Sequence, residues 1–139
     1  MKQILLCLCL LFAACSDSRK ATTGSGPADT NTLIDKKWVL QTIAADTIAL
    51  AKNPFIIFTA DNKVNGFAGC NLFFGAYSQQ DNKLKISDLG STKMACKDDY
   101  VEPKFMQFLG EVDHFAISGD RLILYKGEFS VITFVATAK

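Results

Sequence analysis

The sequence predicts a mainly β (α+β) fold, an antiparallel meander of about eight short strands that forms a small barrel-like domain with one α-helix. Three observations lead to this prediction. Short segments alternate between apolar and polar residues, Gly, Asp and Asn stand between these segments, and one later segment has the periodicity of a helix. With 139 residues, 49% of them hydrophobic, the chain is long enough for one small domain with its own core.

Eight segments read as strands, and turn residues separate most of them. Asp61-Asn62, Asp81-Asn82, Gly119-Asp120 and Gly127 each stand between two such segments. These residue types accept the backbone conformations of tight turns. The predicted strands are residues 38–44, 55–60, 63–69, 71–77, 83–87, 114–118, 121–126 and 128–136.

One segment, at about residues 98–112, departs from the period of two. Its apolar positions follow i, i+4, i+7, i+8 and i+11, which is one face of a helix. Asp98 or Asp99 is expected to cap its start, and Pro103 fits only in the first turn. We expect the helix to close one mouth of the barrel or to cover a face. The phenylalanines expected in the core are Phe55, Phe58, Phe73, Phe74, Phe105 and Phe108.

Residues 1–14 have the shape of a secretory signal. Lys2 precedes an apolar run that is too short for a spanning helix, which needs roughly 20 residues. The sequence FAAC followed by Ser resembles the lipobox of bacterial lipoproteins, which implies that Cys15 is acylated and becomes the new N-terminus. Cys7 and Cys9 lack a small residue in front of them. A plain secretory signal without lipidation is the alternative.

Residues 15–32 are expected to form the lipidated N-terminus and a flexible tether, because they are small and polar. A coil of this length reaches roughly 20–25 Å. Lys and Arg number 15 against 14 Asp and Glu, and loss of Lys2 with the signal makes the two signs equal. The mature chain therefore has no basic field to hold nucleic acid.

Cys70 and Cys96 are the cysteines that remain once the signal is removed and Cys15 is acylated. An even remainder in an exported chain favours a disulfide. A redox-active or catalytic thiol is the first alternative, although the only histidine, His114, lies in an alternating apolar run. A metal site is the second alternative, although no CxxC or HxxxH spacing in the sequence supports it. We expect no cofactor, no metal and no catalytic residue.

The acidic residues at the start of the predicted helix have two interpretations. Negative charge there suits the helix dipole, which makes these residues structural. The alternative is a calcium site formed by Asp98, Asp99 and Glu102.

Three motifs together resemble the META domain, the HslJ-like family: GFAGCNLFFGAY, then LGSTKMAC, then a helix and a closing ISGDRLILY hairpin. The resemblance runs from about Leu33 to the end, so the predicted domain is 33–139. It implies a small envelope or secreted protein with paired cysteines and no established enzymatic activity. It also implies a fold similar to lipocalin-sized barrels and to secretin-pilot lipoproteins, which have an apolar cleft. The matching residues are Trp38, Gly69, Cys70, Asn71, Gly75, Ser91, Thr92, Met94, Ala95 and Cys96.

Some of these motif residues form a candidate binding patch. Asn71, Ser91 and Thr92 are polar groups that the bridge is expected to bring together. The alternative is that they satisfy backbone groups at bends around a disulfide. The complete candidate patch is Trp38, Gly69, Asn71, Gly75, Ser91, Thr92 and Met94.

The expected function is that of a non-enzymatic, lipid-anchored protein of the outer membrane whose domain is a stress-related or accessory binding module. The expected partners are the membrane, through acyl chains, and an unknown protein or small apolar ligand, with the chain itself a monomer. A pilot-like chaperone or an inhibitor of an extracellular enzyme, binding a lipid or protein segment in an apolar cleft, is the second hypothesis. A thiol-redox enzyme is the third.

Overall fold

The structure is a computed structural model, and it describes residues 33, 34, 36–96 and 101–137. This part of the chain contains nine strands and one long helix, α2. The elements are β1 (Lys37–Ile43), β2 (Asp46–Thr47), β3 (Phe55–Phe58), β4 (Lys63–Phe67), β5 (Leu72–Gln80), β6 (Lys83–Ser91), α2 (Val101–Glu111), β7 (His114–Ser118), β8 (Arg121–Lys126) and β9 (Phe129–Thr137).

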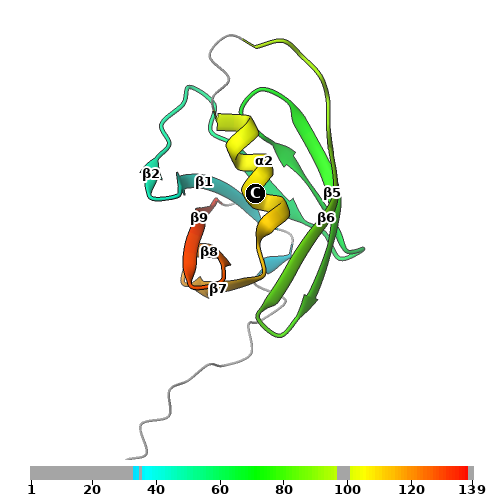
Figure 1. The fold of residues 1–139 in the computed structure, drawn as a ribbon, viewed down its shortest axis with the longest axis vertical. Helices are drawn as coiled ribbons and strands as arrows, with labels where there is room; N and C mark the ends of the chain where they lie inside the picture. The colour runs from blue at the N-terminus through cyan, green and yellow to red at the C-terminus, as the bar shows by residue number, and fades with distance from the viewer. Residues whose placement is uncertain (1–32, 35, 97–100, 138–139) are drawn as a thin grey trace, which may run out of the picture.

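The strands form an antiparallel ring (Figure 1). Neighbours in sequence pair with each other from β3 to β9, and β1 pairs with both β3 and β9. The two-residue strand β2 is attached to β1 and was not predicted, because a pair this short has no periodicity to detect. The predicted fold class, a mainly β barrel-like domain with one helix, is confirmed.

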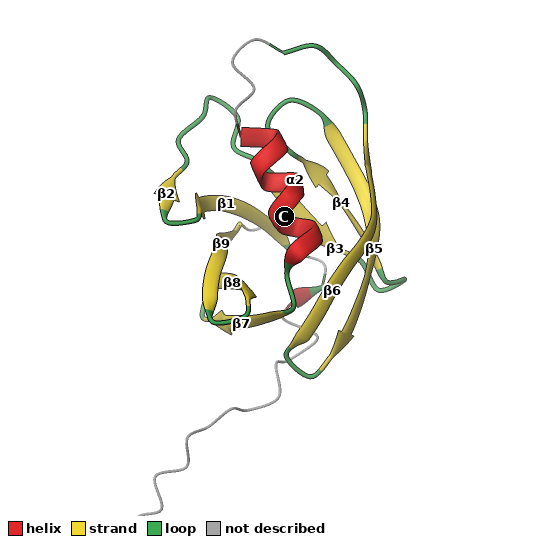
Figure 2. Cartoon of the chain, viewed as in Figure 1, coloured by secondary structure: helices red, strands yellow, loops and turns green. Residues whose placement is uncertain are grey.

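Helix α2 covers the ring where neighbouring strands are least tightly joined, and one face of the helix is buried while the other is exposed. Strands β6 and β7 share a single register pair, Lys83 with His114, and α2 connects them along the chain. Figure 2 shows the helix between β5 and β6 on one side and β9 and β1 on the other. The Phe105 ring lies between those of Phe73 and Phe134, with centroid distances of 5.7 and 6.1 Å. The helix is therefore part of the core, as predicted.

The observed helix lies within the predicted range, although the proposed cap residues Asp98 and Asp99 fall outside the described residues. Among the described residues, no helix has the length and apolar character required to cross a membrane.

The core prediction for the phenylalanines is correct for Phe58, Phe73 and Phe105 and wrong for Phe74, whereas Phe55 and Phe108 are partly exposed, with Phe108 packed against the core. Phe58, Phe73 and Phe105 are fully buried, but Phe74 is 61% exposed. Successive side chains of a strand point to opposite faces, so an inward Phe73 requires an outward Phe74. Its ring lies against Gly90 of the paired strand, where a Cβ would be 2.7 Å from the ring.

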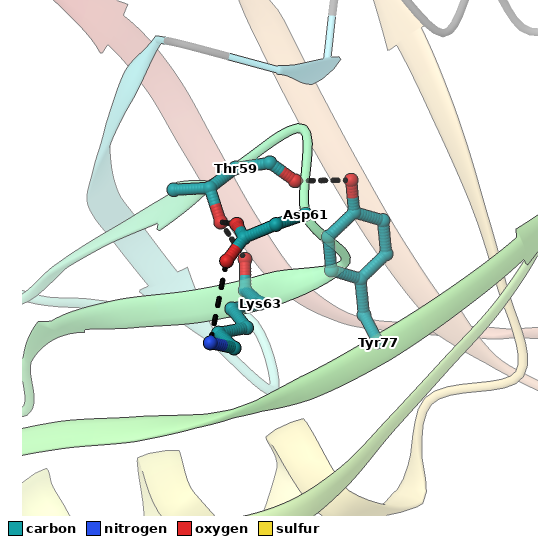
Figure 3. Close-up of polar contacts among 4 residues, drawn as sticks. All are labelled: Thr59, Asp61, Lys63 and Tyr77. Carbon is teal, nitrogen blue, oxygen red and sulfur yellow. Dashed lines mark hydrogen bonds and ion pairs between the residues drawn. The ribbon is translucent and has the colours of Figure 1, made fainter.

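The turn between β3 and β4 shows why Asp61-Asn62 predicted it correctly (Figure 3). Asn62 has a φ of 61°, a conformation that asparagine accepts. The Thr59 hydroxyl donates to the Asp61 carboxylate, and this bond is the main reason why the pKa of Asp61 lies below its usual value. Lys63 pairs with Asp61 at 3.3 Å, and the Tyr77 hydroxyl donates to the Thr59 carbonyl at 3.0 Å. These contacts serve the turn itself.

Candidate functional site

The predicted disulfide is present and joins two loops. Cys70, in the loop between β4 and β5, is bonded to Cys96, in the segment that follows β6. The two Cα atoms are 6.0 Å apart, and 26 positions separate the residues in sequence. Gly69 has a φ of +121°, so a residue without a Cβ is favoured next to the bridge.

Asn71 connects three parts of the chain at the bridge. Its Oδ1 accepts from the Thr92 hydroxyl at 2.9 Å and from the Met94 backbone N–H at 2.7 Å. Its Nδ2 donates to Oε1 of Glu102 at 3.0 Å. The Thr92 hydroxyl also accepts from the Leu72 backbone N–H at 3.2 Å. Asn71 and Thr92 therefore hold backbone groups around the bridge.

Glu102 is the member of this cluster whose position at the bridge the sequence did not predict. Its side chain, in the first turn of α2, is only 8% exposed. Oε2 accepts from the backbone N–H of Asn71 at 2.7 Å and from that of Cys70 at 3.3 Å. Glu102 thus attaches the start of the helix to the bridge. The sequence signal, an acidic residue in a first helical turn, gives no hint of a partner 31 residues away.

Of the three residues in the calcium alternative, Asp98 and Asp99 lie outside the described residues, and the Glu102 carboxylate accepts from N–H groups of Cys70 and Asn71. Within residues 33, 34, 36–96 and 101–137, no group of three His, Cys, Asp or Glu side chains is arranged to hold a metal ion.

The remaining residues of the candidate patch lie elsewhere. Trp38 is fully buried, and its Nε1 donates to the Leu33 carbonyl at 2.9 Å. A Cβ on Gly75 would be 2.8 Å from the Ser87 carbonyl oxygen. Ser91 pairs with Phe73 at the end of β6. The structure therefore gathers Gly69, Asn71, Thr92 and Met94 at the bridge and places the other three in the ring.

His114 forms a separate cluster at the start of β7. Its ring stacks on Tyr125, with centroids 4.7 Å apart, and its Nδ1 bonds to the Asp113 carboxylate. The other Asp113 oxygen accepts from the Gly127 backbone N–H at 2.7 Å. The Gly127 N–H, and then His114, hold the pKa of Asp113 below its usual value. This cluster fixes the turn between β8 and β9 beside the end of α2.

An open apolar groove of about 910 Å³ lies next to that turn. Phe108 of α2 and the turn after β1 form part of its lining, and Phe129, 76% exposed, stands in it at the start of β9. The lining residues are Ala44, Ala45, Phe108, Lys126, Gly127, Glu128, Phe129, Ser130 and Val131.

These features of the described residues define the class of the protein as a small disulfide-bridged domain in which an antiparallel ring packs against the helix α2. The META domain family model matches residues 31–139, and the chain belongs to this family. A protein from Burkholderia xenovorans solved by NMR is similar, with a TM-score of 0.65 and 24% identity over 82% of this chain and 92% of that one. A second NMR structure gives a TM-score of 0.62 with 19% identity over 76% and 92%. At these identities the likeness concerns the fold. No curated protein matches the chain.

Proposed function

We propose that the chain is a non-enzymatic, lipid-anchored protein of the cell envelope, delivered to the outer membrane, whose META domain is an accessory binding module. The disulfide between Cys70 and Cys96 is the observation that carries this proposal. Such bonds persist in oxidising compartments, which supports export and therefore the interpretation of residues 1–14 as a signal and Cys15 as the acylated residue. A role in stress stays a prediction from the family resemblance.

The contacts at the bridge support a non-enzymatic role. Asn71 and Thr92 direct their polar atoms at backbone groups and at each other, and Glu102 accepts from the backbone as well. Groups that act as general acids or bases must reach a substrate proton. Side chains already engaged within the fold are poorly placed for that task.

Intact mass spectrometry of protein purified from membranes, with and without reductant and alkylation, tests the proposal. We expect a chain that begins at Cys15 with acyl mass, and two thiols that appear only after reduction. The Cys15→Ser variant should lose the acyl mass and leave the outer-membrane fraction. An unacylated native chain would contradict the anchor, and hydrolytic or thiol-transfer turnover that Cys70→Ser or His114→Ala abolishes would contradict the non-enzymatic role.

The groove favours a second candidate function, that of a chaperone for an acyl chain, similar in kind to pilot lipoproteins. Its lining is mostly apolar, and Phe108, Phe129 and Val131 are its largest apolar side chains. A bound peptide would bring N–H and C=O groups that need partners, and burial without them is costly. An acyl chain brings none, so the lining suits a lipid better than a protein segment.

Binding of a fluorescent fatty acid to the purified protein tests the acyl-chain hypothesis. We expect Phe129→Asp to weaken binding, because it places a charge in the apolar lining, whereas Ala116→Asp, at an exposed position of β7, should leave binding unchanged. Equal binding by both variants, or displacement of the probe by apolar peptides and not by fatty acids, would contradict the hypothesis.

A further inference from the structure

Four neighbouring strands carry large apolar side chains on the outside of the ring. The register places Val39 of β1 beside Phe55 of β3, Phe55 beside Phe67 of β4, and Phe67 beside Leu72 of β5. Each alternates with an inward position such as Trp38, Ile56, Gly66 or Phe73, so all four lie on the outer side. We define the outer apolar face as Val39, Phe55, Ile57, Phe67, Leu72 and Phe74. Phe67 is only 8% exposed, and the exposed Asn65 lies between Ile57 and Phe74.

The exposure of this face is greatest at β5. Leu72 is 56% exposed and Phe74 is 61% exposed, and these are two of the four large apolar side chains that stand out on the described surface. A third, Met94, lies at the border of the face, because its backbone N–H is bonded to Asn71, the residue before Leu72. Exposed apolar side chains gathered in this way mark an interaction surface.

The charged residues within the four strands of the face have one sign. The Lys37 ammonium lies 4.1 Å from the centroid of the Phe55 ring, and the Lys52 ammonium lies 4.4 Å from that of Phe67. Strands β1, β3, β4 and β5 contain no Asp or Glu. Lysine stems that lie over apolar surface while their ammonium groups stay in water are typical of a membrane interface.

The backbone of these strands is not available to a partner. Each of β1, β3, β4 and β5 is hydrogen-bonded on both sides within the ring. An extended peptide therefore cannot add to the sheet here, and recognition depends on side chains alone. A surface of apolar side chains with cations beside it is complementary to lipid headgroups with acyl chains below them.

The start of the domain lies beside the same strands. Ile34 forms a bridge with Phe58 of β3, and the Leu33 carbonyl accepts from Trp38 of β1. The described chain therefore begins at β1 and β3, two of the four strands of the face, with Leu33 itself fully buried in the core.

We propose that the outer apolar face docks on an anionic lipid bilayer, with Leu72 and Phe74 at the boundary of headgroups and acyl chains. This inference rests on the proposed acyl anchor, which holds the domain near the bilayer. The anchor supplies the proximity, and the face determines which side of the domain meets the lipid.

The test uses the full acylated chain reconstituted in vesicles, with tryptophan fluorescence quenched by brominated lipid. Flotation with the vesicles first checks the anchor. Phe74→Trp then places a reporter in the face, and Ala116→Trp places a control on exposed β7. The native chain, whose one tryptophan is Trp38, gives the baseline. We expect quenching at position 74 to exceed that at 116 by about twofold or more, since interfacial groups lie roughly 5–10 Å into the lipid.

A second set of measurements tests the role of charge by comparing vesicles of phosphatidylcholine alone with vesicles that also contain phosphatidylglycerol. Quenching at position 74 should rise with the anionic lipid, and the combined Lys37→Gln and Lys52→Gln changes should remove that rise. Lys85→Gln, at an exposed position of β6, is the matched control and should retain it.

The outcomes separate the two proposals. A chain that floats but shows equal quenching at 74 and 116 overturns the docking face and leaves the anchor intact. A response at position 74 that depends on protein concentration and not on lipid also overturns it, in favour of contact between copies. A chain that carries no acyl group and does not float overturns the anchor and the docking face together.

Discussion

Asn71→Asp tests whether the polar cluster at the bridge holds the fold together. In the native protein Nδ2 of Asn71 donates to Oε1 of Glu102 at 3.0 Å. The substitution keeps the shape of the side chain but replaces this donor with a second carboxylate oxygen. The contacts of Oδ1 with Thr92 and Met94 are unchanged in kind, because an oxygen still accepts there. Nδ2 also lies 3.5 Å from the Cys70 Sγ and 3.5 Å from the Met94 carbonyl oxygen, and the substitution removes these two longer contacts as well.

The expected loss of stability follows from the 3.0 Å distance between Asn71 Nδ2 and Glu102 Oε1 and from the burial of the two residues, which are 5% and 8% exposed. Two unit charges about 4 Å apart repel by about 4 kcal/mol at an effective dielectric constant near 20. Sharing of a proton between the two carboxylates limits the loss. We therefore expect the free energy of unfolding at pH 7 to fall by about 3 kcal/mol, a large share of the roughly 5–15 kcal/mol typical of a domain.

Urea unfolding with the disulfide intact provides the assay, and Glu102→Gln provides the decisive second change. In the double variant the new amide at position 102 can donate to the carboxylate introduced at position 71, while its oxygen still accepts from the backbone of residues 70 and 71. Stability should return to within about 1–2 kcal/mol of the native value, although either single change is destabilising. Asn82→Asp, at an exposed turn, should alter stability by less than about 0.5 kcal/mol. Purely additive losses in the double variant would refute the reasoning.

Two further predictions concern the turns and the packing of the ring. Gly66→Ala should lower the free energy of unfolding by about 3 kcal/mol or more, because the new Cβ would lie 2.0 Å from the Phe55 carbonyl oxygen. Gly127→Ala, where the new Cβ meets no atom but φ is +57°, should lower it by only about 1–2 kcal/mol. Thermal unfolding measures both changes. Asp113→Asn should make the free energy of unfolding less dependent on pH in the acid range. The pKa of Asp113 in the folded protein is below the usual 3.8, so Asp113 stabilises the fold above that pH. This stabilisation is lost as the pH falls through the folded pKa. An unchanged acid profile in urea unfolding at several pH values would contradict this assignment.

The alternation of apolar residues predicted the ring because the pattern is local, but it failed where the backbone departs from the pattern. Strands β5 and β6 extend to Gln80 and Ser91, beyond the predicted ends. The end of β5 is polar and projects as a hairpin, so no alternation marks it. In β6 a bulge with Asp88 at φ 53° shifts the register, and the period of two is lost from the sequence at that point.

The candidate site was only partly predictable for a related reason. Counting the cysteines predicted a bond between Cys70 and Cys96, because these are the two that remain after removal of the signal and acylation of Cys15. The role of Glu102 depends on where α2 enters the ring, which is a property of tertiary structure. The outer position of Phe74 depends on the phase of β5, and aromatic residues in a strand favour the core in most contexts. Exposure at such a position is therefore informative about function.

The segment that follows β6 connects the disulfide bridge with the proposed docking face. Met94 in this segment is restrained in two ways. Cys96, close to it in sequence, is bonded to Cys70, and the Met94 backbone N–H donates to Asn71 Oδ1. The two restraints act differently. The disulfide limits the unfolded chain, and for a loop of about 26 residues its reduction should lower global stability by roughly 3–4 kcal/mol. The hydrogen bond acts locally. Asn71→Ala should therefore speed hydrogen exchange at the Met94 amide by about tenfold with the bridge intact, equivalent to roughly 1–2 kcal/mol. If Met94 exchange responds to reduction alone, the covalent bond positions this border of the face and Asn71 does not.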